Sequence, residues 1–254
     1  MPDHLFIFSF AVIYPVAGFV GYRRLLRKVA AGEPVDRKLL YLHTVIWHWI
    51  FFILGLIVWT LSERPWAGLG FTFDLDTRFM IGVVLTIAAV ALLFAQLRQV
   101  AKATQEDINR ALGEFGQVAL IMPRNRSELT RFDVLSITAG IVEETLWRGF
   151  LIWYLIQFMT IWAAAVASAV GFGIAHGYQG LANVPRIMLV GAVFSGLYVL
   201  SGSLWLPMIL HAAVDLLQGR LAYQVLARAD SATSSCPISL TPATSASKSD
   251  LRLR

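Results

Sequence analysis

Long stretches without charged residues dominate the chain. Four of them, which contain no Lys, Arg, Asp or Glu, cover residues 39–62, 79–97, 149–185 and 187–214. About 20 apolar residues, each rising 1.5 Å along a helix, are enough to cross the hydrocarbon core of a membrane. The pattern therefore predicts an all-α protein, a polytopic bundle of membrane helices.

We expect about seven transmembrane helices. They cover residues 5–22, 39–61, 79–98, 132–157, 160–176, 186–200 and 204–220. A shorter, amphipathic helix is expected between the third and fourth spans, because Thr104 precedes Glu106 and Asp107 and apolar residues then recur at helical spacing. Such a helix is typical of the membrane interface.

The chain divides into three parts on this interpretation. Residues 1–131 are expected to form an N-terminal three-helix membrane region with a cytoplasmic loop. Residues 132–220 are expected to form the helical core that carries the chemistry. Residues 221–254 are predicted to be a disordered cytoplasmic tail, because Ser, Thr and Ala predominate from residue 229 onward.

Composition agrees with a lipid bilayer as the surroundings of the protein. Of the 254 residues, 57% are hydrophobic and 15% are charged, whereas a soluble domain has about 25% charged residues. The formal net charge of +5 does not indicate nucleic-acid binding, since the basic residues stand in short loops beside the apolar stretches. Cys236 is the single cysteine, which excludes an intrachain disulfide and a Cys-x-x-Cys site.

The charges of the loops predict the orientation in the membrane. The loop 23–38 contains six Lys or Arg residues and two acids, whereas the loop 62–78 is net negative. Because positive loops stay in the cytoplasm, we expect the N-terminus outside and the C-terminus inside. No Lys or Arg precedes the first apolar stretch, so a retained helix is expected instead of a cleaved signal peptide. The compact chain favours a bacterial inner (plasma) membrane.

Charged residues inside the predicted spans mark the candidate chemistry. In the last four spans, those well inside a helix are Glu143, Glu144, Arg148 and Asp215. Facing lipid would cost roughly 3 kcal/mol for each of them, so they must face protein or a wet cavity. Glu144 and Arg148 stand four residues apart with the acid first, which predicts a structural ion pair. Glu143 lies about 100° round the helix and is left free. A purely structural role of these charges stays open here.

Two histidines accompany these carboxylates on separate helices. His176 ends the fifth predicted span, and His211 precedes Asp215 by four residues on the seventh. Histidines and carboxylates gathered in an apolar half of a chain constitute an acid–base or metal-binding constellation. Counting the helical rise places Glu143 and His211 near the middle of the membrane, and His176 close to its cytoplasmic face.

The other histidines are expected to have no chemical role. His4 lies near the N-terminus. His43 and His48 stand five residues apart on the second predicted span, which is about 140° in projection, so they cannot share one face. We interpret them as interfacial or packing residues.

Three motifs in this half of the chain resemble those of a known family. The stretch Glu143–Arg148 fits E-E-x-x-x-R, Phe172–His176 fits F-x-x-x-H, and His211–Asp215 fits H-x-x-x-N/D. Over roughly residues 130–220 the chain is similar to the CAAX-protease and bacteriocin-processing family of intramembrane proteases, the Ras-converting endopeptidase-like group also called Abi. That family often has Asn where this chain has Asp215, and the first three predicted spans carry none of its motifs.

The resemblance implies an intramembrane endopeptidase that cleaves a membrane-associated protein or peptide precursor without a cofactor. It implies that Glu143 and His176 activate a water molecule and that His211 and Asp215 stabilise the tetrahedral intermediate. A zinc-dependent variant, with Glu143, His176 and His211 as ligands, is the alternative mechanism. The H-E-x-x-H, G-x-S-G and G-x-G-D motifs of other intramembrane proteases are absent from the sequence.

A rival function comes from a different class of protein. A non-enzymatic transporter or scaffold would use the buried Glu and His residues to relay protons or bind a cation. It predicts proton-dependent flux and no cleavage of a peptide.

Overall fold

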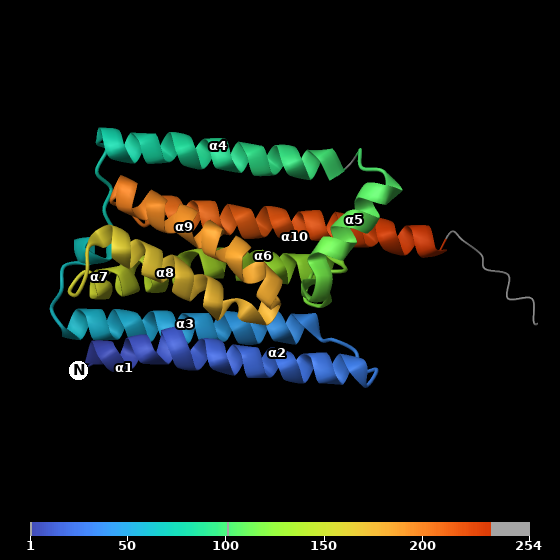
Figure 1. Ribbon diagram of the computed structural model, residues 1–254, viewed down its shortest axis with the longest axis horizontal. Coiled ribbons are helices and arrows are strands. Elements are labelled where there is room, and N and C mark those ends of the chain that lie inside the picture. Colours follow the sequence, from blue (N-terminus) through green and yellow to red (C-terminus); the bar gives the residue numbers. More distant parts are fainter. Residues whose placement is uncertain (1, 101, 235–254) are drawn as a thin grey trace, which may run out of the picture.

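The computed structural model describes residues 2–100 and 102–234. These residues form helices and no strand, as the all-α prediction requires. Most of the helices run along one long axis, and the short α5 crosses the bundle near one end (Figure 1). Helices suit a membrane because they satisfy their backbone hydrogen bonds within one segment.

The N-terminal region contains three long helical segments and the crossing helix. Their bounds are α1 (Pro2–Phe8), which continues through a π-helical turn at Ser9–Ile13 into α2 (Tyr14–Ala30), then α3 (Arg37–Leu61), α4 (Thr77–Val100) and α5 (Gln105–Phe115). The start of α3 is fixed by Asp36, whose side chain accepts a hydrogen bond from the backbone N–H of Leu39 at 3.0 Å. That contact satisfies one of the backbone donors left over at a helix start.

The helix α5 is the short amphipathic helix that the sequence predicts. Thr104 is its N-cap, and Thr104 and Asp107 exchange hydrogen bonds in a capping box. These hydrogen bonds from Thr104 lower the pKa of the Asp107 carboxyl below its usual value. Next to Asp107 in the chain, Ile108 is buried in one cluster with Leu97 of α4 and Val225 of α10. The helix α5 thus packs against the bundle through one apolar face.

The C-terminal half consists of four further helical segments. Their bounds are α6 (Arg126–Glu144), which continues through a π-helical turn at Thr145–Leu151 into α7 (Ile152–Leu155), then α8 (Ile161–Ala175), α9 (Val184–Ser201) and α10 (Trp205–Ser234). Figure 1 shows α6 in the middle of the bundle, and it packs against α3 and against α10. The helices α8 and α9 pack against each other. The site residues of α6 therefore have neighbours on several sides.

The close approach of α6 and α10 depends on a glycine. A Cβ atom at Gly140 would lie 2.8 Å from the backbone oxygen of Met208 and 2.9 Å from the backbone nitrogen of Ala212. Small residues at helix contacts let backbones approach closely, and this is a common way of packing helices in membranes. Gly140 stands one turn before Glu144 and so sets the distance between that residue and α10.

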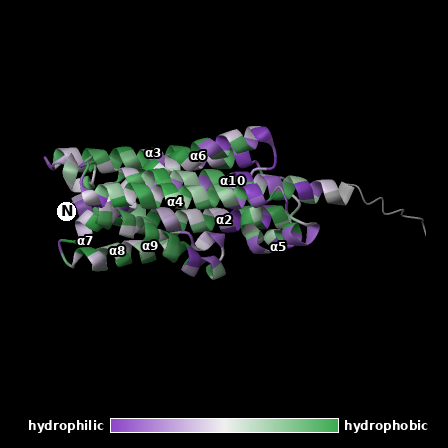
Figure 2. Cartoon of the chain, turned by 90° about the horizontal axis from the view of Figure 1, so that it is seen from above, coloured by the Kyte–Doolittle hydropathy of each residue, from purple (hydrophilic) through white to green (hydrophobic). Residues whose placement is uncertain are grey.

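Four helical segments in the described residues are long and apolar enough to cross a membrane. They are Pro2–Ala30, Arg37–Leu61, Thr77–Val100 and Leu181–Ser201. Seven spans are not confirmed and stay a prediction, because α8 has only 15 residues and α6 and α10 include charged side chains. Hydrophobic residues dominate the length of the bundle, and hydrophilic residues gather at the end where α5 lies (Figure 2).

The last helix is longer than the sequence pattern predicts. It continues to Ser234, so a disordered tail that starts at residue 221 is wrong for residues 221–234. The reason is packing: Leu221, Ala222, Val225 and Leu226 are buried, and the helix runs alongside α4 and α5. The rest of the predicted tail, residues 235–254, lies outside the described residues. The division at residues 131 and 132 stays a prediction.

Candidate active site

Two consecutive carboxylates of α6 face different neighbours. Oε1 of Glu143 lies 2.8 Å from Nε2 of His48 on α3. Oε1 of Glu144 lies 2.7 Å from Nδ1 of His211 on α10. Consecutive residues of a helix point about 100° apart, and both α3 and α10 pack against α6. The site therefore has two halves, one around each carboxylate.

The first half is built around Glu143. His48 occupies Oε1, whereas Oε2 is buried and has no hydrogen-bond partner among the described residues. Nε2 of His176 lies 3.7 Å from this second oxygen, which is beyond direct hydrogen-bonding distance. Two polar atoms at this separation can both reach one water molecule at about 2.8 Å. The first half thus presents an unoccupied carboxylate oxygen next to a histidine nitrogen.

His176 is placed by the end of α8. It is the C-cap residue, and its Nδ1 lies 2.8 Å from the backbone oxygen of Phe172. A carbonyl oxygen can only accept, so Nδ1 carries the hydrogen and Nε2 is the atom directed at Glu143. The expectation that His176 is separated in depth from Glu143 is wrong, because side chains of a helix point back toward its N-terminus. The imidazole ring of His176 therefore points back toward the middle of the bundle.

The second half is built around Glu144 and Arg148, which are both fully buried. Nη1 of Arg148 donates to Oε1 of Glu144 at 2.9 Å, the i to i+4 pair that their spacing predicts. Nη2 of Arg148 donates to the backbone oxygen of Gly191 at 3.1 Å. The guanidinium also lies 4.4 Å from the centroid of the Phe172 ring. Arg148 therefore connects α6, α8 and α9 around one buried charge.

Arg148 lies in a π-helical turn. The turn spans Thr145–Leu151, directly after the two glutamates. Such turns are frequent at functional sites. Here the carbonyl of Trp147 accepts a hydrogen bond from the hydroxyl of Ser168 on α8 at 2.7 Å. The turn is thus held by a neighbouring helix.

His211 lies between two carboxylates. Its Nδ1 contacts Glu144, and its Nε2 lies 3.7 Å from Oδ2 of Asp215, one turn further along α10. The ring stacks on Phe194 with the centroids 4.8 Å apart. His211 is buried, whereas 36% of the Asp215 side chain is exposed. The open side of this half is thus at Asp215.

Phe172 connects the two halves. Its ring centroid lies 4.4 Å from that of His176 and 5.9 Å from that of His211. The first residue of the F-x-x-x-H motif therefore packs between the two histidines and beneath Arg148. All six residues selected from the sequence contact at least one other member of the set.

Sequence reasoning missed His48. Interpreting it as a packing or interfacial residue is wrong, because its Nε2 contacts Glu143. Its Nδ1 lies 2.8 Å from the backbone oxygen of Thr44 and 3.2 Å from the hydroxyl of Tyr14. The available signal was a lone imidazole in the middle of an apolar helix, since ionisable residues within a membrane are by default candidates for function. His43 on the same helix is exposed.

No metal centre is assembled in the part of the chain that the structure describes. There, no group of three or more His, Cys, Asp or Glu side chains is arranged to hold one metal ion. The zinc alternative needs Glu143, His176 and His211 to converge, but His211 is turned toward Glu144. The residues as placed do not fit a zinc centre.

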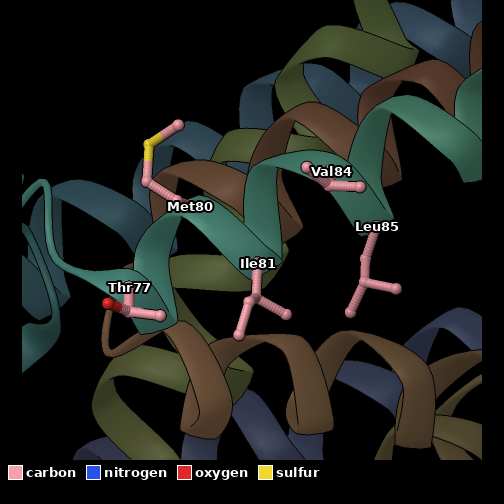
Figure 3. Close-up of a pocket in the computed structure, with 5 residues that line it drawn as sticks. All are labelled: Thr77, Met80, Ile81, Val84 and Leu85. Carbon is pink, nitrogen blue, oxygen red and sulfur yellow. The ribbon is translucent and has the colours of Figure 1, made fainter.

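A hollow on α4 is unrelated to this chemistry. It is lined by Thr77, Met80, Ile81, Val84 and Leu85 (Figure 3). None of these side chains is ionisable, and those of Met80, Ile81, Val84 and Leu85 are exposed apolar groups. Such a surface suits contact with lipid.

A comparison with known protein families found one family whose sequence model matches this chain. Residues 125–217 match the sequence model of the family described as Rce1-like, the type II CAAX prenyl endopeptidases. This part of the chain is similar to the CAAX-protease family. The match covers all three motifs and both halves of the site except His48, and it supports an intramembrane protease. No curated protein and no solved structure matches the chain.

Proposed function

We propose that the protein hydrolyses a peptide bond of a membrane-associated protein or peptide precursor, with Glu143 as the general base. One observation carries the proposal: Oε2 of Glu143 has no hydrogen-bond partner among the described residues and lies 3.7 Å from Nε2 of His176, and 15% of the Glu143 side chain is exposed. Oε2 of Glu144 also lacks a partner there, but the Glu144 side chain is fully buried and its Oε1 contacts Arg148 and His211. Peptide hydrolysis needs a base that can reach a water molecule. Glu143 meets this need, whereas Glu144 stabilises the buried Arg148 and contacts His211.

In the proposed reaction, Oε2 of Glu143 takes a proton from a water molecule that Nε2 of His176 also contacts. The water oxygen bonds to the carbonyl carbon of the peptide, and the carbonyl oxygen becomes an oxyanion. When the C–N bond breaks, Glu143 returns the proton to the leaving amine. The products are a carboxylic acid and an amine, and Glu143 is again ionised.

The second half of the site stabilises the oxyanion in this proposal. Nδ1–H of His211 is used on Glu144, since a carboxylate only accepts. Nε2 donates to the oxyanion when the ring carries a hydrogen on both nitrogens, and the carboxylate of Asp215, with Oδ2 3.7 Å from Nε2, favours this protonated form. Removing one such donor from a protease costs about 10²–10³-fold in kcat.

A cleavage assay with and without a zinc chelator tests this function. Purified protein in proteoliposomes is offered three internally quenched peptides: one with a farnesylated Cys-aliphatic-aliphatic-X end, one bacteriocin-type leader peptide and one membrane-spanning precursor. We expect cleavage of at least one peptide, full activity after chelation and no bound zinc by metal analysis. Inhibition that only added zinc reverses would refute the metal-free mechanism.

The same proteoliposomes test the rival class. A transporter would acidify or alkalinise the lumen when a pH gradient is applied, and it would leave all three peptides intact. We expect cleavage and no proton flux above that of empty vesicles. Flux that disappears with Glu143→Gln, combined with intact peptides, would support the transporter instead.

A further inference from the structure

His48 lies outside the segment that matches the CAAX-protease family, yet it contacts the proposed base. It stands near the middle of α3, in the N-terminal region that carries no family motif. The side chain is buried, and α3 packs against α6 along the face that presents Glu143. Nε2 of this imidazole lies 2.8 Å from Oε1 of Glu143, so α3 contributes a polar contact to the candidate site.

The two nitrogens of His48 have fixed partners. Nδ1 lies 2.8 Å from the carbonyl oxygen of Thr44, one turn earlier in the same helix. That oxygen can only accept, so Nδ1 carries a hydrogen and the ring cannot rotate without losing this bond. Nε2 is therefore held toward α6. The hydroxyl of Tyr14, 3.2 Å from Nδ1, and the ring of Tyr14 close the other side of the imidazole.

Occupation of one oxygen decides which oxygen of Glu143 is available. For Glu143 to act as an ionised base, the proton in the hydrogen bond between Nε2 of His48 and Oε1 must belong to Nε2, which then donates. Oε1 is consequently hydrogen-bonded to His48, and this bond holds the carboxyl group of Glu143 in one rotamer. Oε2 is then the oxygen that faces His176. Without His48 the carboxyl group would be free to turn and either oxygen could point away from the water.

We infer that His48 is a positioning residue for the proposed general base, through its hydrogen bond to Oε1 of Glu143. This inference rests on the proposed function and adds a residue from the N-terminal helices to the site. It also gives those helices a role in the reaction: α3 supplies one wall of the catalytic centre.

Substitution of His48 tests the inference. The probe is the quenched peptide that the unaltered protein cleaves. His48→Ala should lower kcat about 10- to 100-fold and leave KM within about twofold, because a misplaced catalytic group loses rate without losing substrate contacts. His48→Gln should restore kcat to within about fivefold, since its amide nitrogen reaches the place of Nε2 and donates. His43→Ala, on the exposed face of the same helix, is the matched control and should match the unaltered protein.

A pair of amide variants keeps the test decisive if His48→Ala does not fold. His48→Asn and His48→Gln are both polar and neutral, but the shorter Asn cannot reach Glu143. We expect His48→Gln to be active and His48→Asn to be slow, with equal thermal unfolding temperatures. Equal kcat values for these two variants, or an unchanged kcat in His48→Ala, would overturn the positioning role.

The outcome for Glu143→Gln separates the two proposals. If Glu143→Gln is inactive while His48→Ala is fully active, the proposed function stands and the role of His48 is refuted. If Glu143→Gln is itself fully active, the proposed function fails and the inference about His48 fails with it.

Discussion

Oε1 of Glu144 accepts hydrogen bonds from Nδ1 of His211 at 2.7 Å and from Nη1 of Arg148 at 2.9 Å. One carboxylate oxygen thus joins the family's first motif to its third. Because neither Glu144 nor Arg148 is accessible to solvent, each charge depends on the other for stabilisation. The Glu144 half of the site is therefore a structural support that also orients His211.

Removal of the buried guanidinium should destabilise the protein. Arg148→Ala leaves Glu144 as a buried charge without its cationic partner, which costs about 3–5 kcal/mol. We expect the amount of protein in the membrane and the thermal unfolding temperature to fall together with activity. Arg110→Ala is the control, since Arg110 pairs with Glu106 on the surface at 3.5 Å and exposed pairs contribute little. A stable but inactive Arg148→Ala protein would contradict the structural role.

The contact between α6 and α10 should not tolerate a methyl group at Gly140. Its Cβ would lie 2.8 Å from a backbone oxygen, which cannot move aside. We expect Gly140→Ala to destabilise the protein by about 1–3 kcal/mol and to lower activity by moving His211 away from Glu144.

Gly196→Ala is the matched control for this substitution. Nothing lies within 4 Å of a Cβ atom at Gly196 on α9. Alanine stabilises an open helical position by about 0.5–1 kcal/mol over glycine. Thermal unfolding in detergent should therefore move in opposite directions for the two variants. A shift of the unfolding temperature in the same direction for both variants would show that the close contact at Gly140 does not determine the stability of the protein.

Reporter fusions test the predicted orientation of the chain in the membrane. We expect fusions after Glu33 and Ser234 to report the cytoplasm and a fusion after Asp74 to report the outside, because the loop 23–38 is basic and the loop 62–78 is net negative. Any other order would refute both the orientation and the number of spans assumed between these positions.

Local features of the site could be predicted from the sequence, and long-range ones could not. The spacing of four residues is enough to predict the pair of Glu144 and Arg148, since it depends only on helix geometry. The contact between His48 and Glu143 joins residues 95 positions apart. It depends on how α3 packs against α6, and no periodicity encodes that packing.

The same distinction explains the differences in the fold. The apolar stretches predict where most helices lie, because hydrophobic length is a property of each segment alone. The π-helical turn at Thr145–Leu151 and the extension of α10 to Ser234 depend on neighbouring helices. Ser168 holds the turn, and contacts with α4 and α5 support the end of α10.

The role of Glu143 as the general base is tested by the rate at which Glu143→Gln cleaves the quenched peptide. Glutamine keeps the shape of the side chain and removes the basic oxygen. We expect Glu143→Gln to accumulate in the membrane and to unfold at the same temperature as the unaltered chain, but to cleave the quenched peptide about 10²–10⁴-fold more slowly. A folded Glu143→Gln protein with an unchanged cleavage rate would show that Glu143 is not the general base.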